Sequence, residues 1–232
     1  MPAIGMCPTL KEVLCPTDSV LIVMNGTTKE QAPVGTEGWS LWAQGFMKDW
    51  LDERGVTPSC WVDLHAATVR EEPKGWDAAY PSWLKRSAVP VLLRRKHRAY
   101  PASVSYPWVA LRAQFQDFAF PLAGTLDHLV LLAGIFGVSR VGLYGCDYDS
   151  AQERLTQTFG AAFAIGWVMG RGVKVVIPKL SPLLWNVCAG QYGEHFPPWP
   201  YGLDPRQAEI FENQDMNRIT AFCKRPSRLT YA

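Results

Sequence analysis

Short apolar runs separated by polar turns predict a sheet whose strands are covered on both faces. The clearest run is 19–24, in which Val20 to Met24 are continuously apolar. A continuous run, rather than an alternation with polar residues, is typical of a parallel strand buried by helices on both sides. By the same pattern we expect further strands at 39–43, 60–65, 89–93, 141–144 and 173–178.

Longer stretches between these runs have helical character. Thr125 is the expected N-cap of an apolar helix that extends to Phe136 and stops at Gly137. We expect other helices at 45–54, 80–86, 152–170 and 204–220. Residues 1–18 are expected to form a loosely ordered arm, and the proline-punctuated segment 99–121 an irregular connection.

The order of elements indicates the fold class. Helix, strand, helix and strand follow one another between 125 and 178 with short connections, and parallel strands need crossovers of that length. We therefore expect an α/β protein with a Rossmann-like, open, mainly parallel sheet and helices on both faces. The 232 residues suit a single domain, with a core at about 19–184 and an aromatic, proline-rich elaboration at 185–232.

Composition narrows the classes of function. The net charge of +2 does not indicate a dedicated nucleic-acid binder, and the basic run Arg94, Arg95, Lys96 and Arg98 is either a solvated face or a phosphate contact. The six cysteines form no C-x-x-C pair, which favours reduced, packed thiols. With no secretory leader and no apolar run of membrane-spanning length, we expect a cytoplasmic protein without a membrane partner.

Chemistry is expected where the strands end, because ligands of open parallel sheets bind beyond the carboxyl ends. Asn25, Gly26 and Thr27 follow the first strand and suit phosphate or ribose oxygens, or simply a turn. Gly124 and Thr125 open a helix whose amide groups favour an anion, or are merely capped.

Acidic and histidine side chains are the candidate catalytic groups. Asp63 and His65 stand two apart on a strand and so face the same side, as a base and the residue that orients it, or as a structural pair. In the turn from Gly145 to Asp149, the carboxylates of Asp147 and Asp149 suit a hydroxyl or a divalent cation. Glu153 follows on the next helix, and His195 lies in an aromatic loop.

The segment from Gly124 to Leu184 resembles phage-encoded Rossmann-like proteins. It combines a Gly-Thr helix start, the strand and turn Val-Gly-Leu-Tyr-Gly-Cys-Asp-Tyr, and a later Val-Val-Ile-Pro strand followed by Ser181-Pro182-Leu183-Leu184. More distantly it resembles bacterial sialyltransferases that use CMP-sialic acid. This resemblance implies a nucleotide cleft formed by Asn25, Gly26, Gly124, Thr125 and Asp147. Those enzymes carry a catalytic histidine after the Gly-x-Asp turn, whereas 150–165 here contains no histidine. Glu153, Gln157, His65 or His195 would have to take the catalytic role of that histidine.

The sequence thus predicts a glycosyltransferase-like enzyme that moves a sugar from a nucleotide-sugar to a hydroxyl acceptor. Asp147 or Asp149 would orient the sugar or a divalent metal, and His65, Glu153 or His195 would deprotonate the acceptor. A hydroxymethylated base in phage DNA is a candidate acceptor, held by the basic run and the aromatic segments 99–121 and 185–201. A non-catalytic nucleotide-sequestering protein and a nucleotide hydrolase are the alternatives, and the sequence leaves the oligomeric state open.

Overall fold

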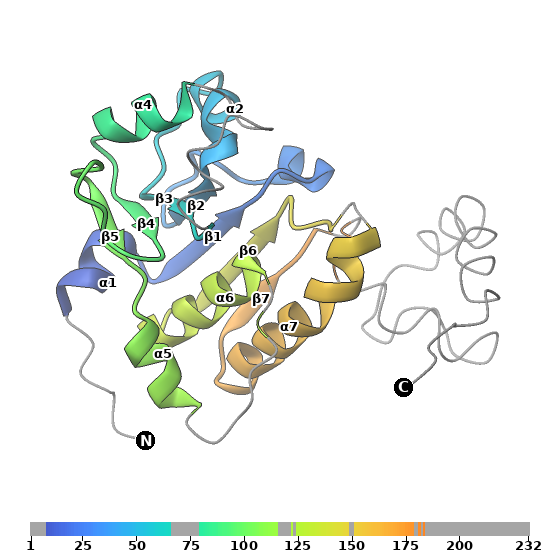
Figure 1. Cartoon of the computed structure of the whole chain (residues 1–232). Coiled ribbons are helices and arrows are strands. Elements are labelled where there is room, and N and C mark those ends of the chain that lie inside the picture. The colour runs from blue at the N-terminus through green and yellow to red at the C-terminus, as the bar shows by residue number, and fades with distance from the viewer. Residues whose placement is uncertain are drawn as a thin grey trace, which may run out of the picture.

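Seven parallel strands form one sheet at the centre of the computed structural model (Figure 1). The structure describes residues 8–65, 79–115, 122, 124–148, 151–178, 181 and 183. The strands are β1 (Ser19–Val23), β2 (Ser40–Gln44), β3 (Cys60–Asp63), β4 (Val91–Leu93), β5 (Ser103–Ser105), β6 (Arg140–Tyr144) and β7 (Lys174–Val176). All six predicted strands are present, and the predicted α/β, Rossmann-like fold is confirmed.

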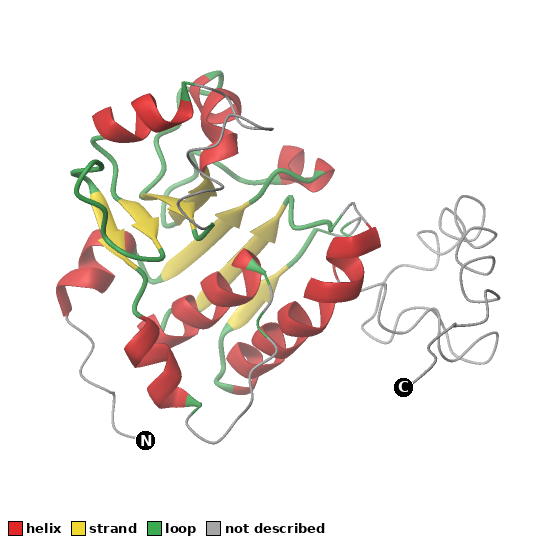
Figure 2. Ribbon diagram, in the orientation of Figure 1, coloured by secondary structure: helices red, strands yellow, loops and turns green. Residues whose placement is uncertain are grey.

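The helices lie on both faces of the sheet, as expected. They are α1 (Pro8–Leu14), α2 (Lys48–Asp52), α4 (Tyr80–Arg86), α5 (Trp108–Gln114), α6 (Thr125–Phe136) and α7 (Ala151–Gly170), with the 3-10 turns η1 (Thr27–Gln31) and η2 (Gly45–Met47). In Figures 1 and 2, α5, α6 and α7 lie together on one side of the sheet.

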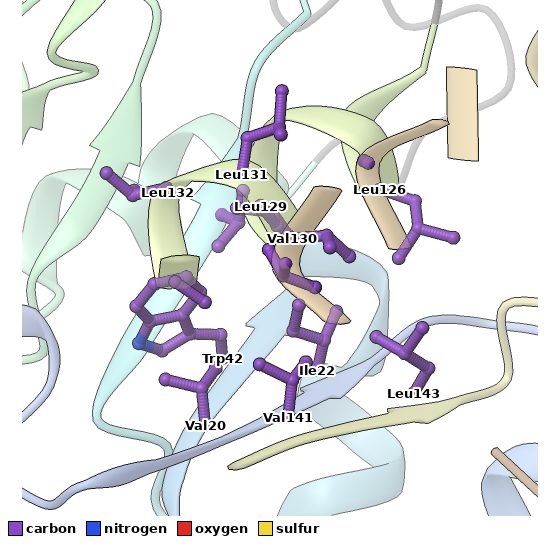
Figure 3. Close-up of a cluster of buried hydrophobic side chains, with 14 of the residues drawn as sticks. Val20, Ile22, Trp42, Leu126, Leu129, Val130, Leu131, Leu132, Val141 and Leu143 are labelled. Carbon is purple, nitrogen blue, oxygen red and sulfur yellow. The ribbon is translucent and has the colours of Figure 1, made fainter. Parts of the chain in front are cut away.

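Successive side chains of a strand point to opposite faces, which divides the core in two. Val20 and Ile22 of β1 belong to the larger cluster, which α6 and α7 cover. Figure 3 shows Val20, Ile22 and Leu143 of the sheet facing the apolar residues of α6. Leu21 and Val23 instead join the smaller cluster, together with residues of α2 and α4. Burial on both sides explains why the strands are continuously apolar.

The strand order β5-β4-β3-β2-β1-β6-β7 contains one reversal. From β1 the chain adds β2 to β5 outward in one direction, and then returns to place β6 on the other side of β1. The carboxyl ends of β1 and β6 therefore flank a topological switch point, where loops diverge and leave a crevice. Val23 of β1 is level with Tyr144 of β6, so the two strands end side by side.

Three segments differ from the sequence prediction. Residues 1–18 were expected to be loosely ordered, but α1 occupies Pro8–Leu14, and Trp42 Nε1 donates to the Leu14 carbonyl (2.6 Å). The segment 99–121 contains β5 and α5, because its prolines precede these elements instead of interrupting them. Helix 45–54 is shorter, as the 3-10 turn η2 followed by α2.

The cap of α6 also differs in one residue. Gly124 is the N-cap in place of Thr125, and its amide donates to Asp127 Oδ2 (3.0 Å). The helix ends at Gly137, as predicted, in the left-handed conformation with φ +68. The helix expected at 204–220 lies outside the described residues.

The three cysteines that the structure describes are packed inside the protein. Cys15, Cys60 and Cys146 are buried free thiols, and burial raises the pKa of Cys60 to about 12. Among the helices that the structure describes, none has the length and apolar character needed to cross a membrane.

Candidate functional site

A cleft of about 560 Å³ lies at the carboxyl ends of the strands and includes the switch point between β1 and β6. Strands β1 to β4 and β6 each contribute to it through their last residue or the loop that follows. Helix α5 contributes Trp108, α6 contributes its first turn, and α7 contributes Gln157. The volume is within the range of small-molecule sites.

Backbone hydrogen bonds join the turns that follow β1 and β6. Met24 N donates to the Tyr144 carbonyl (2.9 Å), and Gly26 N donates to the Gly145 carbonyl (2.7 Å). Gly145 N in turn donates to Thr28 Oγ1 (2.9 Å). The floor of the cleft at the switch point is therefore a fixed unit made of two turns.

Asp147 crosslinks this unit from inside the protein, where it is 1% exposed. Its Oδ2 accepts from Thr28 N (2.8 Å) and Thr27 Oγ1 (3.2 Å). Its Oδ1 accepts from Thr28 Oγ1 (2.6 Å) and from Ser181 Oγ (3.1 Å), which follows β7. Four donors of the chain thus satisfy the carboxylate that the sequence singles out for catalysis or a metal, and the geometry gives Asp147 the role of a structural crosslink.

The close approach of the two turns requires a glycine in each of them. A Cβ on Gly26 would lie 2.5 Å from Asp147 Oδ2, and a Cβ on Gly145 would overlap the Met24 carbonyl oxygen. Gly145 also has a φ of +64, which L side chains rarely adopt. Both glycines line the cleft with Asn25, whereas Thr27 lies outside the lining and bonds to Asp147. The binding of a nucleotide by these residues stays a prediction.

Asp63 and His65 form a hydrogen-bonded pair that opens into the cleft. Asp63 is buried at the end of β3, and its Oδ1 is 3.0 Å from His65 Nδ1. The same oxygen accepts from the His65 backbone amide (3.0 Å), and Tyr80 Oη donates to Oδ2 (3.3 Å). The His65 side chain is 39% exposed and lines the cleft. A carboxylate that fixes one imidazole nitrogen is the arrangement that orients a general base.

His128 is a second histidine of the cleft, and it has a different environment. Its ring lies against Trp108 (centroids 5.0 Å, 78°) and Tyr106 (5.4 Å, 76°). Its Nδ1 is buried with no hydrogen-bond partner among the residues that the structure describes. Burial, and then the charge of Arg94, lower the pKa of His128 to about 4. The imidazole is therefore neutral at pH 7.

The start of α6 is less open to an anion than the sequence implies. The amide of Gly124 already donates to Asp127, a buried carboxylate to which Tyr148 Oη also donates (3.4 Å). This negative charge offsets the positive end of the helix dipole. Both Gly124 and Thr125 line the cleft, and Thr125 is the better placed to contact a ligand.

Of the four basic residues singled out in the sequence, the fold brings Arg94 to the cleft and the other three to the β4–β5 crossover. Arg94 follows β4 and lines the cleft. Lys96 N donates to Ser105 Oγ (2.7 Å) and His97 N to Ser103 Oγ (2.9 Å). The run thus passes backward along β5, away from the cleft. Arg95, Lys96 and Arg98 are exposed on this crossover.

Several predicted site residues cannot be placed against the cleft. Asp149 and His195 lie outside the described residues, and for Glu153 only the backbone, in α7, is described. Within the described part of the chain no three His, Cys, Asp or Glu residues are grouped as metal ligands. The metal at Asp147 and Asp149 stays a prediction, and a cation at Asp147 would have to displace donors that already satisfy it.

The structure adds three residues to the site that sequence reasoning missed. Gln44 ends β2, Trp108 begins α5 and His128 lies on α6, and all three line the cleft. The spacing of Thr125 and His128, three residues apart on a helix, could have placed His128 on the cleft face. No sequence signal would have found Trp108, because the pairing of β5 beside β4 brings it there.

Comparisons of the chain with models of protein families, with curated proteins and with solved structures found no match. The resemblance to sialyltransferases therefore stays a prediction, and the function has to be argued from the cleft itself.

Proposed function

We propose that this protein is a transferase that moves a sugar from a nucleotide-sugar to a hydroxyl acceptor, with His65 as the general base. One observation carries the proposal: the Asp63–His65 pair opens into a cleft at the switch point of a parallel sheet. Switch points are the common ligand sites of this fold class, and an oriented imidazole can accept a proton from a hydroxyl.

In the proposed step His65 acts through its second ring nitrogen. Asp63 holds Nδ1, so Nε2 accepts the proton of the acceptor hydroxyl. The acceptor oxygen forms a bond to the anomeric carbon of the donor sugar. The bond from that carbon to the phosphate oxygen breaks, and the nucleotide leaves with the electron pair. Buried Asp63 stabilises the imidazolium that forms.

The donor nucleotide is assigned to the β1–β6 end of the cleft. Asn25 and Thr125 offer polar groups there. Lys29 Nζ donates to Asn25 Oδ1 (2.9 Å), which places a positive charge beside Asn25. The fixed pair of turns gives the site a rigid floor, which reduces the entropy lost on binding. Asp147 is a lining residue whose carboxylate is satisfied by four donors of the chain, and it supports this floor.

The test is a transfer assay read by mass spectrometry. The protein is incubated with nucleotide-sugars, CMP-sialic acid included, and with plain and hydroxymethylated DNA and small hydroxyl acceptors. We expect one acceptor to gain the mass of a sugar. Replacing His65 with Gln should lower turnover by about 10²- to 10⁴-fold while nucleotide binding, followed by thermal shift, is retained.

His97→Gln is the matched control, because His97 lies on the β4–β5 crossover and outside the cleft lining. Release of sugar or nucleotide without any acceptor would favour a hydrolase. Nucleotide-dependent stabilisation with no turnover across the panel would favour a sequestering protein. Equal turnover in the wild type and the His65→Gln variant would refute His65 as the base.

A further inference from the structure

Arg94, Trp108 and His128 form a surface at the β4–β5 end of the cleft that the proposed transfer step leaves unused. Arg94 follows β4, Trp108 follows β5 and His128 lies on α6. Three successive parts of the chain thus bring a cation, an indole and a neutral imidazole to one wall.

Contacts between the three residues hold this wall in place. Trp108 Nε1 donates to the Arg94 carbonyl (2.9 Å), and the Arg94 guanidinium carbon is 6.0 Å from the indole centroid. The indole also makes an edge-to-face contact with the His128 ring. Tyr106, which is buried, donates from Oη to the His128 carbonyl (2.8 Å) and so ties the first turn of α6 to the end of β5.

The chemistry of this wall suits a ring that carries a negative charge. A guanidinium binds phosphate or carboxylate oxygens in a fixed geometry. An indole packs against nucleobases and against the apolar faces of sugars. His128 is neutral, so it offers a hydrogen bond to an uncharged polar group and leaves Arg94 as the cation of this wall.

The strand order places the wall on the far side of His65 from the donor end. His65 follows β3, which lies two strands from β1 and one strand from β4. With strands about 4.8 Å apart, Arg94 after β4 lies roughly 14 Å from β1. His128 lies one helical turn from Thr125 and joins the wall through its ring contacts with Trp108 and Tyr106. The attacking hydroxyl must contact both His65, which takes its proton, and the donor carbon. The rest of the acceptor therefore extends from His65 away from the donor end, toward the β4–β5 end.

We propose that Arg94, Trp108 and His128 form the acceptor subsite, and that the acceptor is a cyclic compound bearing an anionic group, such as a nucleotide unit or a sugar phosphate. The assignment of this subsite to the acceptor rests on the proposed function. The recognition of an anionic ring rests only on the three side chains.

Calorimetric titration with two probes tests the subsite. The probes are 5-hydroxymethyl-2′-deoxycytidine 5′-monophosphate and glucose 6-phosphate, each added with and without the nucleotide that most stabilises the protein. We expect at least one probe to bind, and to bind also when that nucleotide is saturating. Arg94→Gln should weaken this binding by about tenfold or more, and Trp108→Leu by about tenfold.

Arg112→Gln is the matched control, since Arg112 is an exposed arginine of α5 outside the cleft lining and should leave the probe affinity unchanged. If Trp108→Leu fails to fold, the exposed Arg94 still decides the question. The probe that binds more tightly shows whether the subsite prefers a nucleotide or a sugar phosphate.

Failure of the subsite is distinguishable from failure of the transferase. Probe binding that depends on Arg94, in a protein that transfers no sugar, would support the anionic-ring subsite and refute the transferase. Three results would overturn the subsite: no binding of either probe, equal binding by the Arg94→Gln variant, or competition between probe and nucleotide for one position.

Discussion

His128 is the residue whose burial has the clearest consequence outside catalysis. Its pKa of about 4 in the folded protein lies below the ordinary value of 6.5, chiefly because burial disfavours the charged ring. Between these values the unfolded chain binds more protons than the folded one. The free energy of unfolding therefore falls as the pH is lowered from about 6.5 toward 4.

This linkage predicts a difference between the wild type and His128→Gln. Lowering the pH from 7.5 to 5 should destabilise the wild type by roughly 1–2 kcal/mol more than the variant. Urea unfolding of both proteins at the two pH values measures the difference, and His65 and His97 are common to both. An identical pH dependence would mean that His128 titrates normally and is charged in acid.

His65 shows how far residue-level reasoning reaches. A two-residue spacing on a strand was enough to predict that Asp63 and His65 face the same side, and the structure brings them to 3.0 Å. The spacing of Asp147 and Asp149 looked equally suggestive, but it could not reveal Thr27, Thr28 and Ser181, the donors that surround Asp147. Those partners come from other turns, and only the folded chain brings them together.

At the scale of elements, the joined turns after β1 and β6 are the feature on which the cleft depends. The glycines permit backbone contacts that any larger residue would prevent. Gly137, at the end of α6, has nearly the same φ (+68) as Gly145 (+64), but no atom lies near the position of its absent Cβ. A comparison of the two glycines therefore distinguishes the cost of a left-handed backbone from the cost of a close contact at the Cβ position.

Alanine at these two glycines should have unequal effects. Gly137→Ala should cost about 1 kcal/mol of stability, the strain of a left-handed residue. Gly145→Ala should cost about 2 kcal/mol more than that, because its Cβ meets the Met24 carbonyl. Chemical denaturation measures both costs. Equal losses would show that the turn after β6 can move away from Met24 and is not a fixed floor.

The elements themselves were predictable to different degrees. Strand β1 and helices α6 and α7 were placed from the sequence, because a long or continuous apolar pattern can be recognised without knowledge of the tertiary partners. Helix α1 and strand β5 were missed, since seven and three residues are too few to show a period. Their conformation depends on partners distant in sequence, such as Trp42 for α1 and β4 for β5.

For the whole molecule, the strand order determines the order of the residues along the cleft. His65, after β3, lies between the β1–β6 end and the β4–β5 end. The fold class was predictable from the succession of helices and strands, but the order of strands was not. The proposed placement of donor and acceptor is argued from that order. The division of the basic run also follows from it, because the β4–β5 crossover carries Arg98 away from the cleft.

The central claim is that a nucleotide binds at the switch point between β1 and β6. Hydrogen–deuterium exchange with and without the most stabilising nucleotide tests this claim most directly. We predict slower exchange in 24–29, in the first turn of α6 and in 145–148, with little change in the β4–β5 crossover at 95–102. Protection confined to other segments, with the two turns unchanged, would contradict the account.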